Sequence, residues 1–83
     1  MIHELKIDHE WGQRLRAGEK RCEVRLNDRD YQVGDTLEFR CTRFTGGQDC
    51  PCMSGHLYVV THVLTAFKGL EASYCVLSVR SRT

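Results

Sequence analysis

The sequence has no apolar run close to the roughly 20 residues that a helix needs to cross a bilayer. Its first residues, Met1 to Leu5, also lack the positively charged and then apolar pattern of a secretion signal. Only one proline is present, and we find no internal repeat, no low-complexity tract and no linker. We therefore expect a cytoplasmic protein with no membrane partner, folded as a single domain over residues 1–83.

The sequence also has almost no excess of either charge. It contains 12 Lys and Arg against 11 Asp and Glu, which gives a net charge of +1 with neutral histidines. This balance excludes a protein that binds polyanions through bulk charge, but it allows a local basic face that acids elsewhere offset. A chain of 83 residues buries only slightly more than roughly 60% of its unfolded surface, which argues against a large enzyme with a deep internal active site.

Cysteine, by contrast, is frequent, with five residues at positions 22, 41, 50, 52 and 75. The odd number and the absence of an export signal argue against a disulfide framework, so we expect reduced thiols. Cys22, Cys41 and Cys75 lie at alternating positions among Val, Leu and Phe residues. A free cysteine in such a setting behaves as a small buried hydrophobe, which predicts that these three lie in the core.

Local patterns predict about five strands and one short helix near the amino terminus. Period-two alternation or β-branched content indicates strands over residues 2–7, 21–27, 36–41, 57–65 and 74–80. Asp8 can cap a helix over residues 9–17 that ends at Gly18, docked by Trp11 and Leu15, which lie four apart on one face. The strands are too few for two full sheets, and closure removes exposed edges, so we predict an α+β fold with a small barrel.

The strand predicted over residues 21–27 has one apolar and one polar face. Cys22, Val24 and Leu26 alternate with polar residues, and we expect these three to point into the core. The opposite face, which is then available for chemistry, carries the polar residues Arg21, Glu23, Arg25 and Asn27.

Residues 45–55 are expected to form a long surface loop, because Gly46-Gly47 and the only proline interrupt any regular element. Ligand types that tetrahedral zinc prefers lie in or beside this loop, at Cys41, Cys50, Cys52 and His56. The Cys-Pro-Cys spacing has one intervening residue instead of two to four, and a second Cys-x-x-Cys pair is missing. The sequence therefore favours a loop with exposed thiols over a zinc site, and we expect no cofactor.

The segment from Gly18 to Arg25 is the most informative one for function. It places Lys20, Glu23 and Arg25 at the junction of the predicted helix and strand, with the last two on one strand face. A guanidinium in that position can donate two parallel hydrogen bonds to a phosphate or to a carbonyl. The alternative is a solvated strand face that carries an ion pair, and composition alone favours this alternative.

The spacing Gly-x-Lys-x-x-Glu-x-Arg over residues 18–25, followed by Val-Gly-Asp at 33–35, resembles the ASCH domains of the PUA-like superfamily. More narrowly, residues 3–7, 23–35 and 69–78 look like a small bacterial and phage subfamily of unknown function allied to ASCH. The resemblance covers nearly the whole chain except roughly residues 45–56. It implies a small PUA-like mixed β-barrel, a cleft near Lys20 to Arg25, and a role in RNA binding or RNA metabolism.

Some ASCH relatives hydrolyse the amide of acetylated cytidine nucleosides, and these look similar to the present sequence at Gly18, Lys20 and Arg25. They carry a nucleophilic threonine three residues after the lysine, where this sequence has Glu23. A carboxylate cannot simply replace an activated hydroxyl, so the resemblance supports the cleft but not that reaction. In a hydrolase of a modified nucleoside or of RNA, Glu23 is expected to act as a general base, with Lys20 and Arg25 stabilising the developing charge.

The leading hypothesis is an RNA-binding module, and a protein-interaction factor is a third hypothesis. In the RNA-binding module, Lys20 and Arg25 contact an anion or a base carbonyl, and Glu23 orients Arg25 or a base amino group. Tyr31 is the candidate for stacking on an exposed base of RNA or of a nucleotide-like ligand. Phosphate contacts are predicted for Arg29, Arg40, Arg43 and Lys68.

Overall fold

The computed structural model describes residues 1–42, 49–50 and 53–82. Five strands are hydrogen-bonded in the order β1 (Ile2–Asp8), β3 (Thr36–Thr42), β5 (Leu57–Leu64), β6 (Tyr74–Ser81) and β2 (Cys22–Leu26). β1 and β3 are parallel, the other neighbours in this order are antiparallel, and the short strand β4 (Asp49–Cys50) pairs with β3. The helix of the described residues, α1 (His9–Ala17), follows β1 directly.

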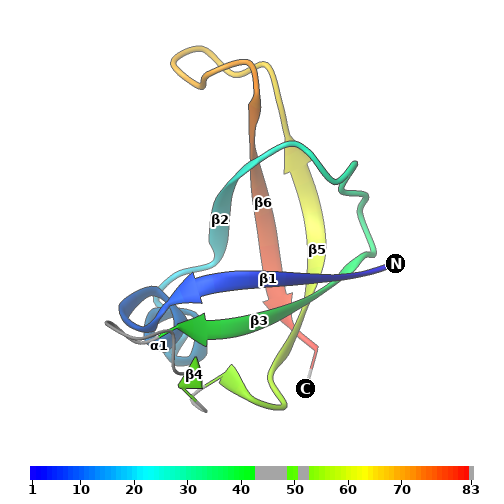
Figure 1. Ribbon diagram of the computed structural model, residues 1–83. Coiled ribbons are helices and arrows are strands. Elements are labelled where there is room, and N and C mark those ends of the chain that lie inside the picture. The colour runs from blue at the N-terminus through cyan, green and yellow to red at the C-terminus, as the bar shows by residue number, and fades with distance from the viewer. Residues whose placement is uncertain (43–48, 51–52, 83) are drawn as a thin grey trace.

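The sheet curls into a half-barrel. In Figure 1, β1 and β3 run across β6 and β5, β2 lies above β1 in this view, and α1 lies beside the carboxyl ends of β1 and β3. β1 and β2 stand at the two ends of the strand order, so the sheet of the described strands is open between them, and we call this opening the seam. The predicted α+β fold, with a small mixed barrel-like sheet and one helix near the amino terminus, is confirmed.

The core fills the inside of the half-barrel. Alternation along β1 places His3, Leu5 and Ile7 inside. The least exposed side chains lie mainly on β3, β5 and β6, and they are Leu37, Met53, Leu77, Val60, Cys41 and Cys75. Complete burial of a large aliphatic side chain contributes roughly 1.5–3 kcal/mol, so these positions hold the two halves of the curled sheet together.

The helix has the predicted bounds, but only one of its two predicted anchor residues, Leu15, is buried. It follows Asp8 without a side-chain cap hydrogen bond, and it ends at Gly18, whose φ of 78° is the left-handed conformation that glycine adopts most easily. Leu15 and Gly12 are buried, whereas Trp11 is 45% exposed, so the prediction that Trp11 docks the helix is wrong. The buried face of the helix contains Gly12 and Leu15, which are three residues apart, and Gly12 allows Met53 to approach closely. Trp11 lies at the edge of this buried face.

The predicted facing of β2 is also wrong. Glu23 is buried, with 6% of its surface exposed, whereas Val24 and Leu26 are 58% and 47% exposed and Cys22 is exposed. The register with β6 explains the inversion, because Glu23 lies opposite Leu77, and residues directly opposite in a pair share one face of the sheet. Leu77 belongs to the core. The polar face of β2 therefore points into the half-barrel.

Two further expectations are tested by burial and pairing. Cys41 and Cys75 are buried, which confirms their predicted place in the core. Cys22 is exposed, so the prediction that it lies in the core is wrong. The expectation of a surface loop over residues 45–55 is wrong in part, because Asp49–Cys50 pairs with β3 and Met53 is buried. Over residues 1–42, 49–50 and 53–82, no helix is long and apolar enough to cross a membrane.

Candidate functional site

Glu23 is the centre of an ion-pair network inside the half-barrel. The Lys20 ammonium contacts its Oε1 atom and also the main-chain carbonyl of Cys22. On the other side, Arg25 donates from Nε to Glu23 Oε2 at 3.0 Å. A buried carboxylate is costly unless it is paired and hydrogen-bonded, and here each of its two oxygens has a cationic partner. The predicted trio of Lys20, Glu23 and Arg25 is thus one connected cluster.

Arg25 also joins β2 to β1 across the seam. Its Nη2 atom donates to the carbonyl of Lys6 at 2.6 Å, and its guanidinium lies 5.8 Å from the centre of the Phe39 ring. Arg29, in the connection after β2, donates to the carbonyl of Glu4 at 3.0 Å. Glu4 and Lys6 are two residues apart, so their carbonyls point to the same edge of β1. Two guanidinium groups thus hydrogen-bond to main-chain carbonyls at the edge of β1 that pairs with no other strand among the described residues.

Two adjoining clefts lie along the seam. The first has a volume of about 340 Å³ and is lined by Glu4, Leu5, Lys6, Arg25, Leu26, Asp28, Arg29, Tyr31 and Arg40. The second has a volume of about 390 Å³ and is lined by Lys6, Ile7, Asp8, Trp11, Glu23, Val24, Arg25 and Leu26. They meet at Lys6, Arg25 and Leu26, which line both. We call the two clefts together the seam groove.

The charges of the first cleft are mainly positive. Lys6, Arg25, Arg29 and Arg40 face two carboxylates, those of Glu4 and Asp28. Arg40 pairs with Glu4 at 3.3 Å, but both side chains are about half exposed, so water screens this ion pair. An excess of two cations over acids in one concavity is a local basic surface on a chain whose overall net charge is +1.

Tyr31 lines the first cleft but does not offer its ring to a ligand. The side chain is 4% exposed, and its ring packs edge-on against His3 with the ring centres 4.8 Å apart. Burial raises the pKa of Tyr31, although the positive charges of Arg29 and Arg25 act in the opposite direction. The prediction that Tyr31 stacks on a base is therefore wrong, because the ring is part of the core.

Behind Tyr31, a buried polar cluster fixes the turn before β3. His3 Nε2 lies 2.8 Å from Asp35 Oδ2, which also accepts a hydrogen bond from the main-chain N–H of Gln32 at 3.0 Å. The amino group of Met1 lies 3.3 Å from Asp35 Oδ1. Burial acts to raise the pKa of Asp35, but the hydrogen bonds from His3, Gln32 and the amino terminus outweigh it and hold that pKa below its usual value. This cluster is structural and was not foreseen from the sequence.

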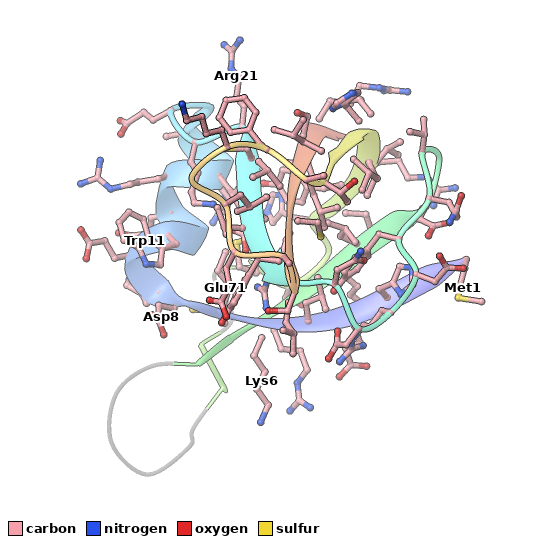
Figure 2. All side chains as sticks on the ribbon, turned by 90° about the horizontal axis from the view of Figure 1, so that it is seen from above. Met1, Lys6, Asp8, Trp11, Arg21 and Glu71 are labelled. Carbon is pink, nitrogen blue, oxygen red and sulfur yellow. The ribbon has the colours of Figure 1, made fainter. Side chains whose placement is uncertain are left out.

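The remaining predicted residues do not all meet at the seam. Lys20 lines a separate cleft of about 380 Å³, together with Arg16, Arg21 and Arg80. Figure 2 shows Arg21 on the opposite side of the molecule from Lys6. Lys68 is exposed in the β5–β6 connection and lines neither cleft of the seam groove, and Arg43 lies outside the described residues.

The zinc hypothesis finds no support in the part of the chain that the structure describes. Cys41 Sγ lies 3.6 Å from His9 Nδ1, and Cys41 is opposite Cys50 in the β3–β4 register. Cys52 lies outside the described residues, and no group of three or more potential ligands that could hold a metal is found among the described ones. His56 instead lines the cleft that contains Lys20.

The structure adds two residues to the groove that the sequence did not single out. Lys6 stands on the exposed face of β1 and lines both clefts, and Trp11 lines the second cleft from α1. Figure 2 shows the Lys6 side chain projecting from β1 and Trp11 at the outer side of the helix. The alternation of β1 carried a signal for Lys6. No comparable signal indicated Trp11, because an apolar residue on a helix is expected to be buried.

The fold and groove together define a small α+β half-barrel with a basic cleft at the open edge of its sheet. The model of a family described as "Domain of unknown function (DUF3850)" matches residues 2–79, and the chain belongs to this family. It is also similar to a solved structure, "Crystal structure of hypothetical protein PH0355", at 18% identity and a TM-score of 0.64, over 98% of this chain and 99% of that one. This likeness shows the fold alone. No curated protein matches the chain.

Proposed function

We propose that this protein binds RNA in the seam groove. The observation that carries the proposal is the gathering of Lys6, Arg25, Arg29 and Arg40 in one cleft of a chain that has almost no net charge. Basic side chains supply most of the affinity of proteins for nucleic acids through contacts with phosphates. The resemblance of residues 18–25 to ASCH domains, which remains a prediction, points in the same direction.

The arginines can hold the fold and contact a ligand at the same time. Arg25 uses Nε and Nη2 for its bonds to Glu23 and Lys6, and Arg29 uses Nη1 for its bond to Glu4. A guanidinium has five N–H donors, so each retains donors beyond these bonds. Because the protein already fixes both side chains, a phosphate that binds them does not have to order them, and less conformational entropy is lost.

A hydrolase that uses Glu23 as a general base is less well supported. Glu23 does line the second cleft, which keeps it near a ligand bound there. Each of its carboxylate oxygens, however, is engaged by Lys20 or Arg25. A general base needs a lone pair within hydrogen-bond reach of the proton that it abstracts, and a carboxylate whose two oxygens are both held by cations has fewer lone pairs to offer than a free one. The ion pairs therefore favour binding over catalysis.

The test is a titration of the protein with a fluorescently labelled single-stranded RNA over a series of salt concentrations. Lys6→Gln is the informative variant, because Lys6 is exposed and lines both clefts. We expect it to weaken binding and to lower the slope of log K against log salt by roughly 0.7, the value for one contact with a single strand. Lys68→Gln removes an exposed charge outside the groove and is the matched control.

Two results would overturn the proposal. The first is an affinity that does not change with salt, since phosphate contacts must release counterions. The second is an equal loss for Lys6→Gln and Lys68→Gln, because this would assign the affinity to the general charge of the chain and not to the groove.

A further inference from the structure

Trp11 is the only tryptophan of the chain, and it is 45% exposed. Its ring is held by its own helix, where the guanidinium of Arg14 lies 6.0 Å over the ring centre. In the second cleft it stands with Val24 and Leu26, which are 58% and 47% exposed. We call these three side chains the apolar shelf. Exposed apolar side chains that line one concavity indicate a surface that a ligand covers.

The charges around the apolar shelf define what can cover it. Lys6 and Arg25 line the same cleft together with two carboxylates, those of Asp8 and Glu23, so the charges of this cleft balance. Glu23 is already paired with Lys20 and Arg25, and the excess of positive charge lies in the adjoining first cleft. The fitting ligand therefore presents a flat apolar surface next to a negative charge. A nucleotide with an unpaired base has this chemistry, because the face of the base is aromatic and the adjoining phosphate is anionic.

Other occupants fit less well. In a double helix each base is stacked on its neighbours, so no face is available to an indole. A second copy of this chain, docked symmetrically through the same surface, would bring the two first clefts close together, each with two more cations than acids. Such a juxtaposition of like charges is unfavourable. The basic flank thus favours a polyanion over self-association.

We propose that Trp11 is a stacking platform for an unpaired nucleobase, so that the RNA held in the seam groove is single-stranded. This inference rests on the proposed function and names the class of RNA. The first cleft then contacts phosphates through Lys6, Arg29 and Arg40, and the next base along the strand lies on the apolar shelf. Stacking of a base on an aromatic side chain is tolerant of sequence, because every base has a flat face.

The single tryptophan makes the test direct. Its intrinsic fluorescence is followed during titration with a single-stranded RNA, with a duplex of the same sequence, and with an abasic oligomer of the same length. We expect the single strand to quench the emission and to bind more tightly than either of the others. In anisotropy titrations with labelled RNA, Trp11→Ala is expected to weaken binding roughly 5- to 150-fold, the range for loss of one stacked base. Trp11→Phe, which keeps an aromatic face, is expected to retain most of the affinity.

The possible failures separate the two proposals. If the abasic oligomer binds as tightly as the single strand, Trp11→Ala has no effect, and Lys6→Gln still weakens binding, the groove binds phosphates and the stacking proposal is wrong. If no RNA binds, both proposals are wrong. A shift of Trp11 emission that depends on protein concentration and that RNA does not reverse assigns the apolar shelf to self-association and also overturns the stacking proposal. Circular dichroism of each variant checks that the fold is retained.

Discussion

Replacement of Arg25 by alanine is predicted to destabilise the fold itself. The side chain is 22% exposed and contacts a carboxylate that is 7% exposed, so the ion pair with Glu23 is largely screened from water. The same guanidinium donates to the carbonyl of Lys6 across the seam. Arg25→Ala therefore removes one partner of a buried pair and one charge-assisted bond between β2 and β1.

The expected magnitude follows from these contacts. Removal of one partner of a buried ion pair typically costs roughly 3–5 kcal/mol, because a buried charge is left unpaired. The cost for Glu23 is smaller, since Lys20 continues to contact its Oε1 atom. Loss of a hydrogen bond from a charged donor adds roughly 1.5–3 kcal/mol. If the remaining Lys20 contact reduces the cost at Glu23 to about 1–2 kcal/mol, the total is about 2.5–5 kcal/mol. This is a large part of the roughly 4–12 kcal/mol that a domain of this size has.

Equilibrium unfolding in urea measures this loss. Arg25→Ala is expected to unfold at a lower urea concentration with an unchanged slope, while Arg40→Ala, whose ion pair with Glu4 is about half exposed, is expected to lose roughly 0–1 kcal/mol. Arg25→Lys keeps the charge but not the forked geometry, so we expect an intermediate stability. Equal midpoints for Arg25→Ala and Arg40→Ala would refute the argument that the seam is closed by the guanidinium of Arg25.

Three further predictions concern stability and reactivity. Because the pKa of Asp35 is lowered in the folded state, the contribution of its carboxylate to stability is present above the unfolded pKa of about 4 and is lost as the pH falls through the folded value. The difference in unfolding free energy between wild type and Asp35→Asn is thus expected to be constant near neutrality and to shrink below about pH 4. A difference independent of pH would contradict this. A Cβ atom at Gly12 would lie 3.1 Å from Met53 Sδ, so Gly12→Val is expected to lower the melting temperature by overpacking, whereas Gly12→Ala, which gains helix propensity, is expected to be nearly neutral. Cys22 is exposed while Cys41 and Cys75 are buried, and burial raises the pKa of Cys75. Brief alkylation of the native protein, followed by mass spectrometry, should therefore modify Cys22 and spare the other two. Early labelling of Cys75 would show that the core opens readily.

The parts of the fold that local chemistry determines could be predicted from the sequence. The helix over residues 9–17 has the predicted bounds, because its acidic first turn, its basic last turn and Gly18 are all local signals. The alternation of residues 2–7 likewise predicted a strand at β1. The facing of β2 could not be predicted in this way, because alternation does not say which face is inside when the interior at that point contains an ion-pair network.

The site residues were predictable to a similar extent. The spacing of Lys20, Glu23 and Arg25 indicated a cluster, and the structure brings the three together. The burial of the two aromatic residues was predicted the wrong way round. Tyr31, predicted to be available to a base, is in the core, and Trp11, predicted to dock the helix, is half exposed. Which aromatic ring is buried depends on contacts between elements distant in sequence, such as that of Tyr31 with His3, and no local pattern reports these.

The closure of the seam and the proposed binding depend on the same arginines, and this decides how function has to be tested. Arg25 and Arg29 hold the open edge of β1 through the carbonyls of Lys6 and Glu4, and both line the groove. A loss of RNA binding in Arg25→Ala therefore cannot be assigned to a lost phosphate contact, because the groove itself changes shape when the seam loosens. Lys6 and Trp11 are exposed enough to be replaced without this change. A defect in Lys6→Gln and Trp11→Ala at unchanged urea midpoints would consequently locate the ligand in the groove.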